Sequence, residues 1–308
     1  MSLAAIFPGQ GSQAIGMARD FYDHSAAAKR VLDEAEAAFP GLLTLMWDGP
    51  LETLTLTANQ QPALVAASAA AFAAYTEAGG AMPTFGAGHS LGEYSAYVAA
   101  GALSVADAVR IVNLRGTFMQ DAVPAGRGAM AAVMRASVDD IVAIVNEVST
   151  PDEPVEVANY NSPQQTVISG TKDAVETAGA KLSEQRARVV PLPVSAPFHS
   201  SLMQPAADRL APLLAELTWH NPQFEIVCNV TANVLAGVAD APRLLTEQIT
   251  GSVRWTESIE KLAALGVTRV IEFGSGRVLA GLVGRIDKSI QAHSVTDMES
   301  LKEALSHG

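Results

Sequence analysis

The chain has 308 residues, of which 49% are hydrophobic and 17% charged, so it can bury a sizeable core and is not a disordered protein. Its 20 basic and 32 acidic residues give a formal net charge of −12, which argues against nucleic acid or an anionic membrane as the main partner. The single cysteine, Cys228, excludes an internal disulfide framework and a Cys-rich zinc site.

We expect a cytoplasmic protein without a membrane segment. The N-terminal stretch MSLAAIF has no basic leader, and its apolar run ends at Pro8. The apolar part of the longest charge-free run, 62–75, is shorter than the about 20 residues that span a bilayer.

The first part of the chain predicts alternating strands and helices. Ser104 and Asp107 form a capping-box pattern that predicts the start of one helix. A proline leads another, Ala-rich helix. The predicted elements are a strand at 3–7, helices at 25–38 and 62–77, a strand–turn–helix unit at 84–100 and a helix at 105–121.

A change of pattern follows the linker-like stretch 124–128. The order becomes strand, helix, strand, strand, helix, strand, which is the order of ferredoxin-like domains. The predicted bounds are 129–134, 138–148, 155–160, 166–169, 172–186 and 189–194. We therefore predict an inserted small domain over 125–197 in a larger domain formed by 1–124 and 198–308.

The C-terminal part returns to strands alternating with helices, which predicts a mostly parallel sheet with helices on both faces. The predicted elements are helix 201–217, strand 224–230, helices 241–249 and 256–265, strand 268–273 and a closing helix after the turn 274–276.

The strongest motif for catalysis is Gly88-His89-Ser90-Leu91-Gly92, a G-x-S-x-G pattern between a predicted strand and a predicted helix. That context is typical of a nucleophile elbow, although a Gly-rich turn with a serine helix cap is the plainer alternative. In an elbow, Ser90 projects at the carboxyl end of the sheet beside the backbone N–H of Leu91. The predicted fold class is thus α/β, with an α/β-hydrolase-like main domain and an inserted ferredoxin-like domain.

A serine nucleophile needs a base, and His199 is the best candidate among six histidines. It follows Pro197 at the junction of the two predicted domains, whereas His89 adjoins Ser90 and is expected to point away from it. A lone histidine is more often structural, but the Ser90 motif favours His199. Because no acidic residue between them follows a strand of the main sheet, we expect a backbone carbonyl to orient the imidazole.

Arg115 lies close to the apolar stripe of the helix predicted at 105–121. A buried guanidinium is costly unless it is paired. The helical phase leaves two alternatives open, an internal carboxylate partner or an anionic ligand.

The turn after the first strand, Pro8-Gly9-Gln10-Gly11, fits part of a dinucleotide fingerprint. The acidic residues at the required distance, Asp33 and Glu34, lie in a predicted helix and not at the end of a strand. We therefore interpret the turn as one whose backbone N–H groups approach a ligand oxygen, as half of an oxyanion hole.

These motifs occur together and in a fixed order. They are Phe7-Pro8-Gly9-Gln10-Gly11-Ser12-Gln13, Gly88-His89-Ser90-Leu91-Gly92-Glu93, Asn113-Leu114-Arg115-Gly116, Asn161-Ser162-Pro163 with Gln165, the turn before His199 and Glu272-Phe273-Gly274-Ser275-Gly276. Over essentially its whole length the chain resembles malonyl-CoA:acyl carrier protein transacylases, the acyltransferases of type II fatty acid synthesis. It departs from the family pattern at Ser275, where proline is usual, and in the turn 196–199.

The resemblance implies a role for each matching residue. Ser90 would accept the acyl group and His199 would be its base, while Arg115 would bind the malonyl carboxylate. The remaining implied positions are Gln10 and Leu91 (oxyanion hole, by backbone N–H), Gln248 (orientation of His199, by its carbonyl), Asn161 and Gln165 (acyl-CoA side of the cleft) and Phe198 (malonyl over methylmalonyl selectivity).

The resemblance also implies the partners. The substrates would be malonyl-CoA and holo-acyl carrier protein, with no cofactor or metal, no nucleic acid and no membrane, and the enzyme would be a monomer. Because carrier proteins of this system are acidic, docking would need a local basic patch, and ordinary solvated charges are the alternative. The candidates are Lys181, Arg186, Arg188, Arg285 and Lys288.

Four other functions remain open from the sequence. A polyketide acyltransferase would share the whole mechanism, and a serine thioesterase or hydrolase would use Ser90 and His199 with water as acceptor. A binding module for coenzyme A or carrier protein would form no covalent acyl-serine. A dinucleotide enzyme would depend on Gly9 and Gly11.

Overall fold

The computed structural model of the protein describes residues 2–194 and 196–306. Ser195, which belongs to the turn singled out before His199, lies outside the described residues, as does the tail histidine His307. Within the described ranges, no helix is both long enough and apolar enough to cross a membrane.

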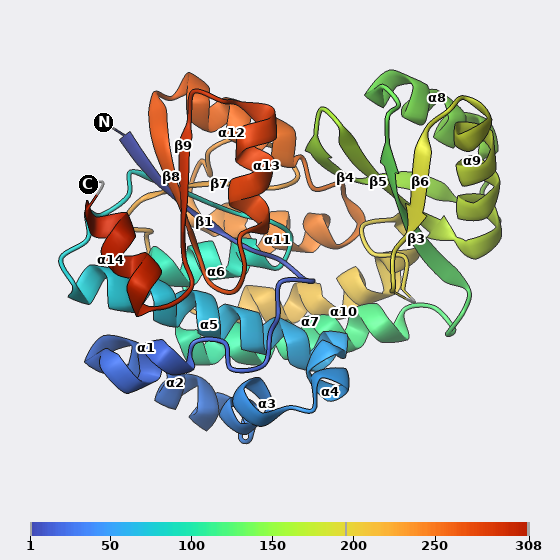
Figure 1. Cartoon of the computed structure of the whole chain (residues 1–308). Helices are drawn as coiled ribbons and strands as arrows, with labels where there is room; N and C mark the ends of the chain where they lie inside the picture. Colours follow the sequence, from blue (N-terminus) through green and yellow to red (C-terminus); the bar gives the residue numbers. More distant parts are fainter. Residues whose placement is uncertain (1, 195, 307–308) are drawn as a thin grey trace.

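A five-stranded parallel sheet forms the centre of the larger part of the molecule (Figure 1). Its strand order is β7-β2-β1-β8-β9, and every neighbouring pair is parallel. The strands are β1 (Ser2–Phe7), β2 (Phe85–Gly88), β7 (Glu225–Val227), β8 (Val267–Phe273) and β9 (Gln291–Val295).

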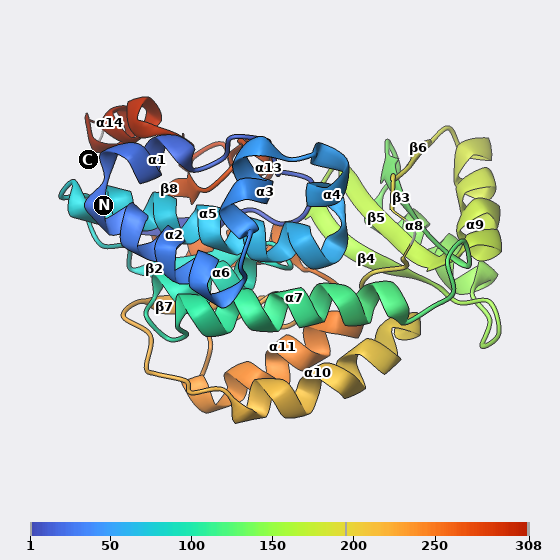
Figure 2. The ribbon, with the colours of Figure 1, turned by 90° about the horizontal axis from the view of Figure 1, so that it is seen from below.

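Helices cover both faces of this sheet, as the alternation of side chains along β1 requires. Ala5 and Phe7 belong to one buried apolar cluster, whereas Ala4 and Ile6 belong to another. The first cluster includes α5 and α7, and Figure 2 shows α7 between α5 and α10. The helices are α1 (Arg19–His24), α2 (Ala26–Ala38), α3 (Leu42–Asp48), α4 (Leu51–Thr55), α5 (Thr57–Glu77), α6 (Gly92–Ala99), α7 (Val105–Asp121), α10 (Gln204–Glu216), α11 (Ala241–Thr250), α12 (Trp255–Ala264), α13 (Val278–Ile286) and α14 (Met298–Ser306).

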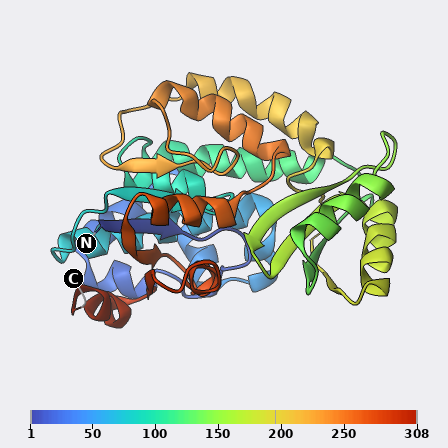
Figure 3. The same ribbon diagram turned by 90° about the horizontal axis from the view of Figure 1, so that it is seen from above.

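A second, antiparallel sheet lies with its two helices at one end of the molecule (Figure 3). Its strand order is β4-β5-β3-β6, and it has an apolar cluster of its own. The elements are β3 (Gly128–Met134), α8 (Val138–Val148), β4 (Val155–Ser162), β5 (Gln165–Thr171), α9 (Lys172–Glu184) and β6 (Arg188–Pro191). A short parallel bridge between Asn159 and Val253 joins β4 to the segment before α12.

Helix α5 corrects the prediction that its proline begins it, because the helix starts at Thr57 and contains Pro62. A proline inside a helix leaves the carbonyl four residues earlier without its partner. Here that carbonyl, of Ala58, accepts a hydrogen bond of 2.8 Å from the Asn113 side chain of α7. The two helices are in close contact, since a Cβ on Gly116 would lie 2.5 Å from the Thr57 carbonyl oxygen.

Other differences from the predicted elements concern short or polar segments. The helix predicted from 201 begins as a single 3₁₀ turn, Ser201–Met203, and α10 proper starts at Gln204. The strand predicted at 224–230 has only the three residues of β7. The sequence analysis ended the fold at α13 and missed β9 and α14, because β9 is a half-polar edge strand.

Candidate active site

Ser90 lies where β2 turns into α6, at the carboxyl end of the parallel sheet. Its φ of +51° is in the left-handed region, which a residue with a side chain adopts only under constraint. The constraint is close packing of the elbow against β1, because a Cβ on Gly92 would lie 2.0 Å from the Phe7 carbonyl oxygen. The G-x-S-x-G pattern thus folds as an elbow that presents the Ser90 hydroxyl.

His199 lies against Ser90, with 2.7 Å between its Nε2 and the Ser90 Oγ. Its Nδ1 lies 2.9 Å from the main-chain oxygen of Gln248 and 3.1 Å from that of Gly251. Because a carbonyl oxygen only accepts, Nδ1 carries the proton and Nε2 offers its lone pair to the Ser90 hydroxyl. Burial, together with the positive charge of Arg115, lowers the pKa of His199 to about 3, so the imidazole is a neutral base.

Arg115 is completely buried beside Ser90 and forms its hydrogen bonds with neutral oxygens. Its Nη1 donates to Gln61 Oε1 (2.9 Å), and its Nη2 donates to Ser90 Oγ (3.1 Å) and Gln248 Oε1 (3.0 Å). Arg115 Nε and Gln61 Nε2 are buried donors without a partner among the described residues. The geometry therefore disfavours a direct internal carboxylate partner and leaves unused donors beside Ser90.

A buried network that the sequence analysis missed surrounds Ser90. Asn229 Oδ1 accepts from the Ser90 N–H (2.7 Å), and Asn229 Nδ2 donates to the Gly88 carbonyl (2.6 Å). Glu93 Oε2 accepts from the Asn229 N–H (3.0 Å) and from Gln248 Nε2 (2.8 Å). Glu93 and Asn229 are both buried, and burial raises the pKa of Glu93 to about 7.

The observed end of β7 explains the place of Asn229, and one sequence signal could have identified Glu93. Asn229 follows β7 at the carboxyl edge of the parallel sheet, where functional side chains gather. Glu93 is a carboxylate in an otherwise apolar or small-residue helix. Burying a carboxylate is costly unless it is hydrogen-bonded, so such a residue indicates a specific partner.

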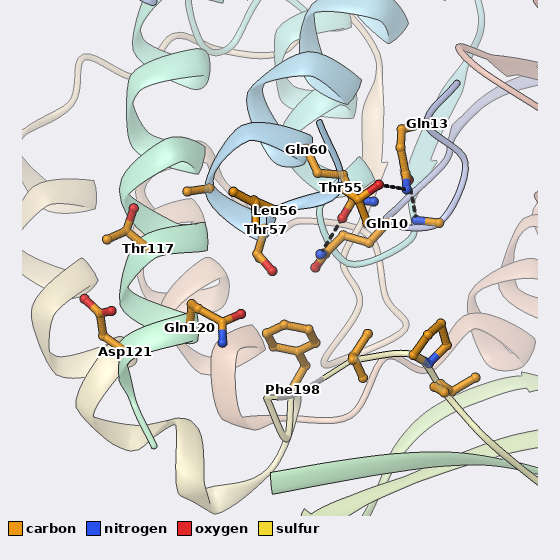
Figure 4. A pocket seen from close by; sticks show the side chains of 15 residues that line it. Gln10, Gln13, Thr55, Leu56, Thr57, Gln60, Thr117, Gln120, Asp121 and Phe198 are labelled. Carbon is orange, nitrogen blue, oxygen red and sulfur yellow. Dashed lines mark hydrogen bonds between the residues drawn. The ribbon is translucent and has the colours of Figure 1, made fainter. Parts of the chain in front are cut away.

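Gln10 and Leu91 lie at the carboxyl ends of neighbouring strands, β1 and β2. The turns that carry them are adjacent, because the His89 N–H donates to the Phe7 carbonyl at 3.0 Å. The Gln10 side chain is held by Gln60 at 2.7 Å (Figure 4). Leu91 is fully buried and immediately precedes α6.

Phe198 and Gln10 line a cavity of about 670 Å³ beside the site (Figure 4). Figure 4 shows the Phe198 ring facing Gln10 and Thr57 across this cavity, with Gln120 of α7 beside it. The wall on the Phe198 side also includes 192–194, which directly follow β6 of the antiparallel sheet.

Asn161 and Gln165 line a different, smaller cavity of about 130 Å³, together with Gln10 and His89. Asn161 Oδ1 lies 2.8 Å from His89 Nε2, so His89 turns toward the antiparallel sheet. The structure therefore brings Ser90, His199, Arg115 and Gln248 into direct contact and places Asn161, Gln165 and Phe198 on the surrounding walls.

The basic residues singled out for docking lie near the antiparallel sheet and α13. Arg186, Arg188, Arg285 and Lys288 are exposed, whereas Lys181 forms an ion pair of 2.5 Å with Glu147. Met134 pairs with Arg188 in the sheet and lines the same cavity of about 500 Å³ as Arg285. In the described part of the chain, no three His, Cys, Asp or Glu side chains are grouped to hold a metal ion.

Comparison with known proteins gives consistent results over nearly the whole chain. Residues 5–274 match the acyl transferase domain family. The chain is 46% identical to the malonyl CoA-acyl carrier protein transacylase of Bacillus subtilis (strain 168), covering 98% of this chain and 96% of that protein. It is 44% identical to the protein of the same name from Escherichia coli (strain K12), covering 98% of each.

Solved structures agree in fold as well as in sequence. An acyl-carrier-protein S-malonyltransferase from Burkholderia pseudomallei has a TM-score of 0.96 and 45% identity, covering 99% of this chain and 100% of that one. A malonyl-transacylase solved in complex with a type II polyketide synthase acyl-carrier protein has a TM-score of 0.96 and 41% identity, covering 100% of both chains.

Proposed function

This chain belongs to the malonyl CoA-acyl carrier protein transacylase family, and from that premise we propose that it transfers malonyl from malonyl-CoA to the phosphopantetheine thiol of acyl carrier protein. It is an acyltransferase that uses Ser90 as nucleophile and supplies fatty acid biosynthesis. The Ser90–His199 pair, 2.7 Å apart and shielded from solvent, supports a covalent malonyl-serine intermediate.

The main support for malonyl as the acyl group is the buried Arg115 beside Ser90. A guanidinium binds a carboxylate in bidentate fashion, and Arg115 Nε and Gln61 Nε2 are donors with no partner among the described residues. A carboxylate at this point would satisfy donors that are otherwise buried at a cost. The one oxygen of an acetyl group belongs to the reacting carbonyl and leaves these donors unpaired, which favours a dicarboxylic acyl group.

The reaction follows from the hydrogen bonds of His199. Nε2 takes the Ser90 hydroxyl proton while Oγ bonds to the thioester carbon, and the proton then passes to the departing coenzyme A sulfur. In the second half-reaction the carrier thiol gives its proton to Nε2 and its sulfur bonds to the malonyl carbon. The bond to Oγ breaks, and Ser90 regains the proton.

The main-chain carbonyl of Gln248 replaces the carboxylate of a catalytic triad in this mechanism. It accepts the Nδ1–H bond of His199, holding the imidazole in the tautomer that can act as a base. We assign the oxyanion hole to the backbone N–H groups of Gln10 and Leu91, because their turns are adjacent at the sheet edge.

The wall residues would contact the rest of the substrate. We place Asn161 and Gln165 along the acyl-CoA path, since they line a cavity with Gln10. The Phe198 ring would crowd a branched acyl group, and a single methyl is discriminated by roughly 1–3 kcal/mol in such a pocket. We therefore expect Phe198 to favour malonyl over methylmalonyl.

The two sheets support a division into two domains. We propose an α/β-hydrolase-like catalytic domain over 1–124 and 198–308, supported by the parallel sheet and its serine elbow. We propose a ferredoxin-like inserted domain over 125–197, supported by the order β3-α8-β4-β5-α9-β6 and the strand order β4-β5-β3-β6.

The location, oligomeric state and partners of the enzyme are also part of the proposal. We propose a cytoplasmic monomer that needs no cofactor or metal and binds neither nucleic acid nor membrane. An acidic carrier protein would be repelled by a chain of net charge −12 unless it met a local basic patch. Arg186, Arg188, Arg285 and Lys288 are the better candidates for that patch, because Lys181 is paired with Glu147.

Intact-protein mass spectrometry after brief incubation with malonyl-CoA tests this function. We expect one malonyl adduct on the wild type, none on Ser90→Ala, and discharge of the adduct by holo-acyl carrier protein. Rapid coenzyme A release without an adduct would point to a hydrolase, and neither adduct nor release would point to a binding module. Because one solved relative is complexed with a polyketide carrier protein, carriers of both pathways belong in the discharge assay.

A further inference from the structure

The side chain of Gln248 connects residues that its main chain does not reach. Its Oε1 accepts from Arg115 Nη2 at 3.0 Å, and its Nε2 lies 3.1 Å from the Ser90 carbonyl oxygen. Its main-chain oxygen meanwhile accepts from His199. One residue therefore contacts the nucleophile, its base and the guanidinium, and the two ends of its amide have different tasks.

An amide has no intrinsic preference for which end faces which neighbour, so its orientation must be imposed by a partner. Glu93 supplies the shorter of two acceptors for Nε2, because its Oε2, which also accepts from the Asn229 N–H, lies 2.8 Å away and the Ser90 carbonyl oxygen 3.1 Å away. Oε1 must then face Arg115, which only donates. Glu93 and Arg115 are in this way joined through the Gln248 amide without touching each other.

The same carboxylate oxygen reaches Ser90 along a second route. Glu93 Oε2 accepts from the Asn229 N–H at 3.0 Å, and the Asn229 amide bonds to the backbone on both sides of His89, at Ser90 N and Gly88 O. These bonds fix the backbone on which Ser90 adopts its left-handed conformation. Glu93, Asn229 and Gln248 are each 1% exposed or less, so no solvent competes for the bonds.

We propose that Glu93 is a positioning residue for acyl transfer, which orients the Gln248 and Asn229 amides and so fixes Arg115 and Ser90 relative to each other. It contacts neither the reacting atoms nor His199. The inference rests on the proposed function, since Arg115 is taken as the site of the acyl carboxylate. Loss of Glu93 would let the Gln248 amide turn over, and Arg115 would lose the contact that holds it toward Ser90.

The test compares Glu93→Ala and Glu93→Gln with a matched control, Glu272→Gln. Glu272 is also a buried carboxylate, but its hydrogen bonds go to the backbone N–H groups of Leu279 and Ala280 at the start of α13. All rates are to be divided by the fraction of chains that accept one malonyl group, so that unfolded protein does not count. The readouts are kcat/KM for malonyl-CoA and the ratio of malonyl to acetyl loading.

We expect Glu93→Ala to lower kcat/KM about 100-fold per active chain, the size of effect that a misplaced reacting group produces. The malonyl to acetyl ratio should fall about tenfold, because Arg115 is no longer held in place. Glu93→Gln keeps an acceptor oxygen for both donors and should recover most of both values. Glu272→Gln should leave both unchanged.

Gln248→Met keeps the inference testable if Glu93→Ala does not fold. Methionine keeps the main-chain carbonyl that holds His199 but removes both ends of the amide, so the malonyl to acetyl ratio should again fall. A wild-type ratio and kcat/KM per active chain in either folded variant would overturn the positioning role. A wild type that malonyl-CoA does not load would instead overturn the proposed function itself.

Discussion

The two sides of the active site differ in how firmly their residues are held. On the side of the parallel sheet, Ser90, Arg115 and Gln248 are buried and joined by hydrogen bonds. On the side of the antiparallel sheet and the segment that follows β6, Asn161 and Phe198 line cavities of very different size. In the proposed function, the reacting end of the substrate meets a preorganised, hydrogen-bonded surface, whereas its long arm runs along the cavities on the other side.

Among substitutions on the hydrogen-bonded side, His199→Ala is expected to cause the largest loss of activity. Without the imidazole, no group accepts the Ser90 proton, although Arg115 and the elbow remain in place. We expect loading by malonyl-CoA to slow by at least about 1000-fold, measured as the first turnover of coenzyme A release. A reduction of less than tenfold would show that another group acts as base.

Arg115→Ala should have the next largest effect and should be selective. Removing the guanidinium takes away the proposed partner of the acyl carboxylate, so kcat/KM for malonyl-CoA should fall about 100- to 1000-fold. Acetyl loading, which does not use the guanidinium, should change far less. Arg110→Ala on the same helix is the control, since Arg110 is exposed and lies 3.8 Å from Asp107. An equal loss for both acyl groups would contradict the assignment.

Asn161→Ala should have a smaller effect of a different kind. One polar contact in these cavities contributes about 1 kcal/mol, so KM for malonyl-CoA should rise about fivefold while kcat stays near its wild-type value. Steady-state kinetics at saturating carrier protein separates the two constants. If kcat fell and KM did not move, Asn161 would belong to the preorganised side.

Glu272→Gln should leave activity unchanged but alter the pH dependence of stability. Burial raises the pKa of Glu272 to about 7 in the folded protein, above its ordinary value of 4.5. The unfolded chain therefore releases this proton at lower pH, and the wild type loses stability relative to the variant as pH rises from about 4.5 to 7. Urea midpoints of both proteins at pH 5 and pH 8 measure the change, and a constant difference would show that the carboxyl group does not titrate in this window.

The sequence predicted those parts of the fold whose signals are local. The capping box at Ser104 and Asp107 placed α7 at its observed bounds, and the glycines around Ser90 predicted the strand–turn–helix unit. The half-polar β9 has no such signal and depends on pairing with β8. The predicted start of α5 at Pro62 was wrong, because the hydrogen bond that a proline cannot donate is replaced by one from Asn113, 51 positions later in the chain.

The site could be predicted from the sequence where a local motif specifies the residue type. It could not be predicted where residues distant in the sequence complete it. The apolar stripe of its helix indicated that Arg115 is buried, yet its helical phase could not decide what it meets. Asn229 contacts Ser90 across 139 positions and Gln248 contacts Glu93 across 155. No periodicity or local spacing encodes such contacts, and only the topology of the sheet brings them together.

The close contact between α5 and α7 has a consequence for engineering. Asn113 and Gly116 lock α7 onto α5 immediately before and after Arg115, so the backbone at position 115 cannot slide or recede. Under the proposed function, recognition of the acyl carboxylate would therefore be changed through the length and charge of the side chain at this point. Exchange of this one side chain would alter which acyl group fits, while the α5–α7 backbone behind it stays in place.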